Sequence, residues 1–83
     1  MTADPCTRYA RRLDAHLATL ANDTERRGFL DREHNKWIDR FETFQRDVLR
    51  NEYTGTATAF DYTITLADIS IRRARYAPVK AEA

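Results

Sequence analysis

The stretch Leu30–Val48, LDREHNKWIDRFETFQRDV, decides the fold of this chain. Its apolar and ring-bearing residues return at alternating steps of four and three: Leu30, His34, Trp37, Phe41, Phe44 and Val48. Residues three and four apart share one face of an α-helix, so this spacing predicts a helix with one apolar stripe and a charged opposite face. The stripe holds the only Trp and two of the four Phe residues, and we expect the other elements to pack against it.

Length and charge bound what the protein can be. The 83 residues correspond to one domain, 1–83, and fourteen basic residues nearly cancel thirteen acidic ones to give a net charge of +1. Nucleic-acid-binding proteins usually carry a strong basic excess, so DNA is not expected as the main partner. The chain has one cysteine, no apolar signal core and no apolar run near the ~20 residues of a membrane span, which favours a reducing cytoplasm and no membrane contact.

Capping patterns divide the chain into helices at about 5–21, 24–51 and 59–76, followed by a tail at 77–83. Asp4-Pro5 is a typical helix start. Asn22 precedes Glu25 by three residues, as in a capping box, which predicts the first bend at 22–24. A bend at 28–30 is the alternative, because Gly28 suits a helix end better than a helix interior.

The segment after the Gly55 loop fits two structures. Thr58 precedes Asp61 by three residues, a helix-cap pattern, yet residues 60–66 also alternate between apolar and polar, as in a strand. We favour a helix, because the chain has no second strand-like run to pair with it and the apolar spacing continues to Ile71. The predicted fold is all-α, either a three-helix bundle or a helical hairpin plus a third helix, with an α+β fold containing a strand at 60–66 as the alternative.

The sequence contains no recognisable catalytic or ligand motif. It has no Gly-rich phosphate loop and no HExxH sequence, and its only Ser, Ser70, falls inside a predicted helix. His16 and His34 lie on different predicted helices and would need further ligands to hold a metal. We therefore expect a non-enzymatic protein without metal or cofactor.

The third helix has more apolar surface than one packed face requires. One stripe runs through Phe60, Ile64, Ala67 and Ile71, and a second runs through Tyr62, Leu66, Ile69 and Tyr76. The surplus indicates either a wide buried face or an exposed patch that binds another protein, where Trp, Tyr and Arg are common anchors. For the second case the candidate partner-binding residues are Tyr62, Leu66, Ile69 and Arg73, with Trp37 or Phe41 at the edge.

The second helix also carries a row of like charges, formed by Arg32, Lys36 and Arg40. The row could dock an acidic surface, although a solvated face is the simpler interpretation.

The run FDYTITLADISIRRARY (60–76), which follows an Arg-rich helix and makes up about a fifth of the chain, resembles the small antiactivators of proteobacterial integrative and conjugative elements. The likeness is to the QseM-type antiactivators. It implies a protein that sequesters transcription activators by direct contact, namely a LuxR-type quorum-sensing regulator, an activator of element excision, or both. No functional residue is carried over from this resemblance.

Two other functions fit the same pattern. A small DNA-binding three-helix protein would place Arg72, Arg73 and Arg75 on phosphates. A coiled-coil homodimer or assembly subunit would use the heptads at 30–48. The expected state is a monomer or a weak homodimer.

Overall fold

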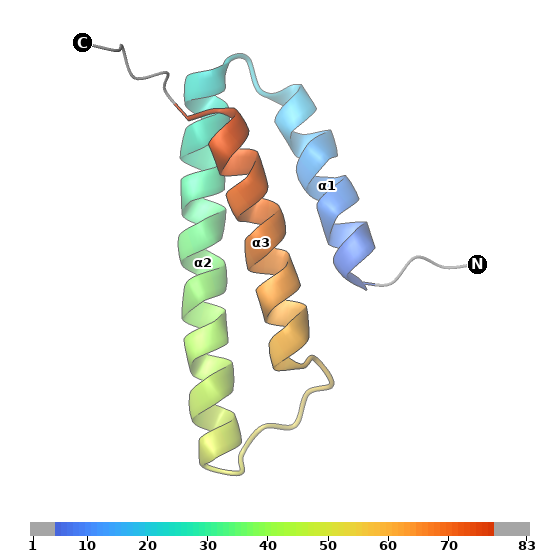
Figure 1. Ribbon diagram of the computed structural model, residues 1–83, viewed down its shortest axis with the longest axis vertical. Coiled ribbons are helices and arrows are strands. Elements are labelled where there is room, and N and C mark those ends of the chain that lie inside the picture. Colours follow the sequence, from blue (N-terminus) through green and yellow to red (C-terminus); the bar gives the residue numbers. More distant parts are fainter. Residues whose placement is uncertain (1–4, 78–83) are drawn as a thin grey trace.

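A computed structural model describes residues 5–77 as three helices (Figure 1). They are α1 (Pro5–Thr19), α2 (Asp23–Leu49) and α3 (Ala59–Arg75). The all-α prediction is confirmed, and the alternative strand at 60–66 is wrong because these residues lie inside α3. The predicted helix bounds agree to within two residues. The expected cap Asp4 and residues 78–83 of the expected tail lie outside the described residues.

The third helix is the one against which both others pack. The backbone of α3 lies close to those of α1 and α2, whereas the backbones of α1 and α2 approach each other at few points and diverge from the bend that joins them (Figure 1). The buried hydrophobic residues are Leu13, Leu17, Leu30 and Ile69, one or two from each helix. The core is therefore small and lies toward the bend, where the three helices meet.

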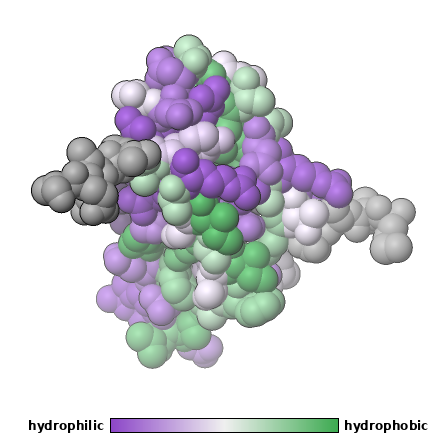
Figure 2. Space-filling model, turned by 45° about the horizontal axis from the view of Figure 1, so that its top comes forward, coloured by the Kyte–Doolittle hydropathy of each residue, from purple (hydrophilic) through white to green (hydrophobic). Residues whose placement is uncertain are grey.

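Of the two apolar stripes on α3, the structure buries the one that holds the candidate partner-binding residues. Ile69 is 0 % exposed and belongs to the core, so its assignment to an exposed binding patch is wrong. The other stripe faces outward, with Phe60 70 % and Ile71 55 % exposed. Figure 2 shows hydrophobic residues running over the middle and lower part of one face, below a more hydrophilic end.

Two ion pairs join α3 to the other helices in this orientation. Arg72 is 8 % exposed and donates two hydrogen bonds to the Asp14 carboxylate in α1, at 2.7 and 2.9 Å. Arg73 pairs with Asp31 of α2 at 2.9 Å. Arg72 and Arg73, two of the three candidates for phosphate contacts, thus form ion pairs within the chain, which weakens the DNA-binding alternative.

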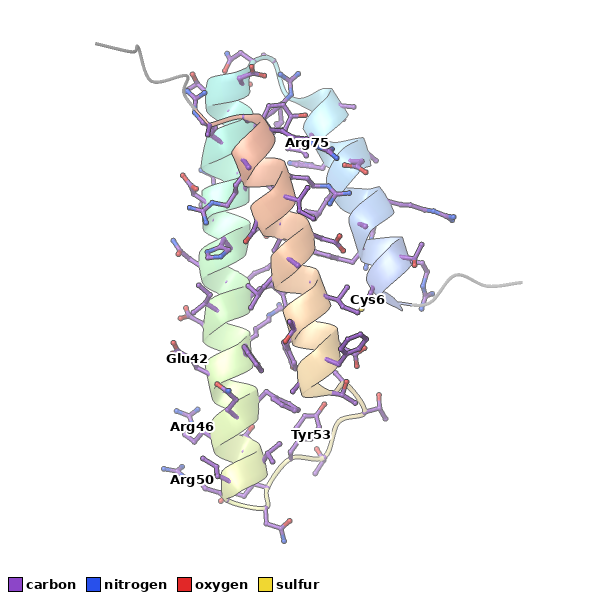
Figure 3. The ribbon with its side chains drawn as sticks, in the orientation of Figure 1. Cys6, Glu42, Arg46, Arg50, Tyr53 and Arg75 are labelled. Atoms are coloured by element: carbon purple, nitrogen blue, oxygen red, sulfur yellow. The ribbon has the colours of Figure 1, made fainter. Side chains whose placement is uncertain are left out.

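The loop between α2 and α3 is held by its tyrosine (Figure 3). The Tyr53 hydroxyl donates to the Ala57 carbonyl at 2.8 Å, and a Cβ at Gly55 would lie 2.6 Å from that hydroxyl oxygen. At the start of α3, Thr58 Oγ1 accepts from the Asp61 N–H, and the Asp61 carboxylate accepts from the Thr58 N–H at 2.7 Å. The predicted capping box is confirmed, and it begins α3 at a defined residue.

The bend between α1 and α2 lies at 20–22, next to the preferred position. Asn22 Oδ1 accepts from the Glu25 N–H at 2.9 Å, and the Glu25 carboxylate accepts from the Ala21 N–H at 2.7 Å. The first bond satisfies an N–H group that a helix start leaves unpaired, and the second holds the residue just before the cap. Gly28 lies within α2, so the alternative bend at 28–30 is wrong.

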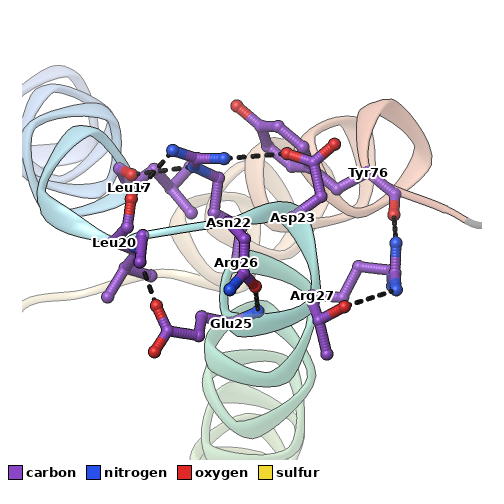
Figure 4. Close-up of polar contacts among 10 residues, drawn as sticks. Leu17, Leu20, Asn22, Asp23, Glu25, Arg26, Arg27 and Tyr76 are labelled. Atoms are coloured by element: carbon purple, nitrogen blue, oxygen red, sulfur yellow. Dashed lines mark hydrogen bonds and ion pairs between the residues drawn. The ribbon is translucent and has the colours of Figure 1, made fainter.

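Two neighbouring arginines of α2 tie the helix ends together on this side (Figure 4). The guanidinium of Arg26 donates to the carbonyls of Leu17 and Leu20 at 3.0 and 2.8 Å. That of Arg27 donates to the carbonyl of Tyr76 at 2.8 Å. The last carbonyls of a helix lack partners within it, so these arginines cap the ends of α1 and α3.

A candidate interaction groove between α1 and α2

A groove of about 500 Å³ opens where α1 and α2 diverge. The residues that border it are Cys6, Tyr9 and Arg12 from α1, Trp37 and Arg40 from α2, Thr56 and Ala57 from the loop, and Asp61, Tyr62 and Thr65 from α3. A second hollow of about 590 Å³ shares Tyr9, Arg12, Trp37 and Arg40 and continues toward the bend. Each hollow has a volume similar to that of a pocket for a drug-sized ligand.

The wall of this groove is aromatic and centres on Tyr62. Its ring stacks on Phe41, with the centroids 5.4 Å apart and the planes 13° apart, and lies 4.9 Å from the ring of Phe44. Trp37 lies 6.0 Å from Tyr62 and meets Tyr9 edge-on at 5.2 Å. Contacts between aromatic rings at these distances are favourable, so the wall is a preformed apolar surface.

The structure brings together three of the six candidate partner-binding residues, namely Tyr62, Trp37 and Phe41. Ile69 is in the core, and Leu66 is half-buried on the same helix. Arg73 is half-buried and bound to Asp31, away from the groove. The apolar stripe of Leu30–Val48 is largely covered by other parts of the chain. Leu30 is buried, and the aromatic rings of the stripe pack on Tyr9 and Tyr62.

The carboxylate of Glu33, on the α2 side, is paired with other residues of the chain. Glu33 accepts from the Tyr9 hydroxyl at 2.7 Å and pairs with Lys36 at 2.8 Å. Burial opposes ionisation of Glu33, but the hydrogen bonds from Lys36 and Tyr9 prevail and lower its pKa. Burial, followed by the hydrogen bond to Glu33, raises the pKa of Tyr9 well above its usual range. Tyr9 is therefore a neutral donor at any physiological pH.

Two guanidinium groups border the groove without an ion pair among the described residues. They belong to Arg12 of α1 and Arg40 of α2. Arg40 lies over the Trp37 ring at 4.8 Å from its centroid, a cation–π contact. The buried indole N–H of Trp37 has no hydrogen bond of normal geometry. This arrangement suits an apolar side chain flanked by a carboxylate.

Sequence reasoning missed most of the α1 side of the groove. Tyr9 and Arg12 look like an ordinary apolar position and an ordinary solvent-facing position of a helix. Arg40 did carry a signal, since it belongs to the basic row with Arg32 and Lys36. Of that row Lys36 is paired with Glu33, and Arg40 is the member that borders the groove.

The described residues offer no metal site, because no three His, Cys, Asp or Glu side chains among them lie close enough to share an ion. His16 instead contacts Phe29, with the ring centroids 4.3 Å apart and the planes tilted by 44°. Within the same part of the chain, each helix is too short or too polar to cross a membrane. Comparisons with protein-family models, with curated proteins and with solved structures gave no match.

Proposed function

We propose that this chain is a non-enzymatic regulator that binds another protein in the groove between α1 and α2. The observation that carries the proposal is the aromatic groove of about 500 Å³ with two guanidinium groups at its rim that form no ion pair with any described residue. Aromatic residues and arginine dominate the binding energy of protein interfaces, and a surface that holds both is suited to an anchor side chain. The complementary segment has an apolar or aromatic residue beside a carboxylate.

The regulator is proposed to be an antiactivator of cytoplasmic transcription activators, in line with its resemblance to the QseM-type proteins. Its target is a LuxR-type quorum-sensing regulator, an excision activator, or both. Inhibition works by mass action: a bound activator leaves the free pool, and its occupied surface is closed to its own partners. Such a mechanism needs no catalytic group and fits the balanced charge of the chain.

Trp37 provides the test, because it is the only Trp and lies in the groove wall. Titration with a purified activator should change its fluorescence and give a dissociation constant. Arg40→Glu should weaken binding by about tenfold or more, because it replaces attraction to a carboxylate by repulsion across the interface. The matched control is Arg46→Glu on the same helix, whose side chain points away from α3 (Figure 3).

The antiactivator proposal also predicts a cellular readout. Expression of the chain should reduce transcription from a promoter that depends on the activator, and the Arg40→Glu variant should restore it while Arg46→Glu should not. Equal binding and equal repression by the two variants would contradict the placement of the partner in this groove. Failure to bind any LuxR-type regulator or excision activator would contradict the antiactivator function itself.

A further inference from the structure

Three hollows follow one another along the same flank of α2. The groove of about 500 Å³ lies in the middle, and it shares Arg12 and Arg40 with the hollow of about 590 Å³ toward the bend. On its other side it shares Arg40 and Tyr62 with a third hollow of about 280 Å³, toward the loop. The α2 residues along the three hollows recur at steps of four and three and so form one row on the helix: Phe29, Glu33, Lys36, Arg40, Thr43 and Asp47.

We infer that the partner segment bound along this row is an amphipathic α-helix that carries an acidic and a basic side chain seven residues apart. The inference rests on the proposed function, because it describes what the groove binds. From Phe29 to Asp47 the row is about 27 Å long, which is the length of a helix of about 18 residues. A helix laid in a groove presents anchors at positions i, i+3 or i+4, and i+7, the same steps that separate the residues of the row. Residues 5–77 contain no strand, so they offer no sheet edge to an extended segment.

The charges along the row change sign from the middle hollow to the one near the loop. At the middle hollow, Arg12 and Arg40 have no ion pair with a described residue, and the Asp61 carboxylate there already accepts from a backbone N–H at the start of α3 at 2.7 Å. The hollow near the loop is bordered by the carboxylates of Asp39 and Asp47, which likewise have no ion pair within residues 5–77. Arg40 and Asp47 are seven positions apart, about 10.5 Å along the helix axis. A partner helix beside α2 therefore complements both with an acid and a base at the same separation.

The hollow nearest the bend accepts an apolar side chain. Its carboxylate, Glu33, is paired with Lys36 at 2.8 Å and bonded to the Tyr9 hydroxyl at 2.7 Å. The rest of its wall includes Phe29 and the buried Leu13. The partner helix thus has an apolar anchor about two turns from its acidic residue, on the side away from its basic residue.

Three synthetic peptides of 18 residues test the inference. They share one apolar stripe, contain no Trp, and carry Glu and Lys, Glu and Glu, or Lys and Lys at two positions seven residues apart. In titrations followed by Trp37 fluorescence, the Glu/Lys peptide should bind about fivefold more tightly than either of the others, because only it meets an opposite charge at both hollows. The bound peptide should also gain helical circular dichroism, and a Pro in its middle should abolish binding.

A charge reversal at the loop end links the preference to this row. Asp47→Arg should reverse the order, so that the Glu/Glu peptide binds more tightly than the Glu/Lys peptide. The matched control is Glu42→Arg, the same change at a side chain of α2 that points away from α3, and it should leave the order unchanged (Figure 3). Equal binding of the three peptides, binding of none at millimolar concentration, or equal binding of the Pro peptide would overturn the inference.

Competition separates this inference from the proposed function. An activator that binds the chain but is not displaced by the Glu/Lys peptide would overturn the helical segment in this row and leave the antiactivator function in place. Peptide binding with the expected charge order, without binding of any LuxR-type regulator or excision activator, would support the helix-binding row and contradict the antiactivator function alone.

Discussion

Two isoleucines that are two positions apart on α3 should respond very differently to the same substitution. Ile69 is 0 % exposed and Ile71 is 55 % exposed, so Ile69→Ala and Ile71→Ala remove the same atoms from a core and from a surface. At Ile69 the change deletes three buried carbons, worth about 2.4 kcal/mol at ~0.8 kcal/mol each, and leaves a cavity that raises the loss to about 3–4 kcal/mol. At Ile71 less area is lost and Ala is the better helix former, so we expect a change within about 0.5 kcal/mol of zero.

The difference is large relative to the whole stability of the protein. A chain of 83 residues has a free energy of unfolding of about 4–12 kcal/mol. Urea denaturation followed by Trp37 fluorescence and by circular dichroism, at a protein concentration low enough for a monomer, measures both variants. Ile69→Ala should lower Tm by more than about 10 °C. If both variants lost the same stability, or Ile71→Ala lost more, our assignment of the buried face of α3 would be wrong.

Two further predictions concern an ion pair and the glycines. The hydrogen bonds from Arg72 lower the pKa of Asp14, so the pair stabilises the fold above the normal carboxyl pKa and loses that stability as the pH falls. Asp14→Asn should therefore lower the free energy of unfolding by about 1 kcal/mol at pH 7, allowing for the exposure of Asp14. In urea denaturation, the variant should also show a smaller fall in that free energy below about pH 5. Gly28→Ala should raise Tm and increase the free energy of unfolding by up to ~1 kcal/mol, because a Cβ at this position meets only the end of the flexible Arg32 side chain at 3.3 Å. Gly55→Ala should lower Tm, because its Cβ would displace the hydrogen-bonded Tyr53 ring. A Tm that moved in the same direction for both glycines would contradict these assignments.

Local chemistry was sufficient to predict the helices from the sequence. The Thr58–Asp61 pair fixes the start of α3, because a capping box acts over three residues and needs no tertiary contact. The Asn22–Glu25 pair likewise identified the first bend, even though Gly28 offered a second candidate. Boundaries of this kind are visible in a sequence because the groups that satisfy each helix end are its neighbours in the chain.

The rotation of α3 could not be predicted in the same way. Its two stripes show the same helical spacing, and contacts between residues far apart in the chain, such as the pairing of Arg72 with Asp14 58 residues away, go with the orientation that the structure adopts. A long-range ion pair leaves no periodic signal, so Ile69 was assigned to the surface and Ile71 was not. The groove could not be predicted for the same reason, because Tyr9 and Arg12 border it only once α1 has packed beside Trp37.

The packing of both other helices on α3 has a consequence for biosynthesis. A nascent chain that has grown only to Thr58 holds two helices whose backbones meet at few points, and its leucines lack Ile69 to close the core. Cooperative folding must therefore wait until the final helix has left the ribosome, and the first two thirds of the chain are exposed to proteases and chaperones until then. The cellular level of the protein should depend on how quickly and completely translation of α3 is finished.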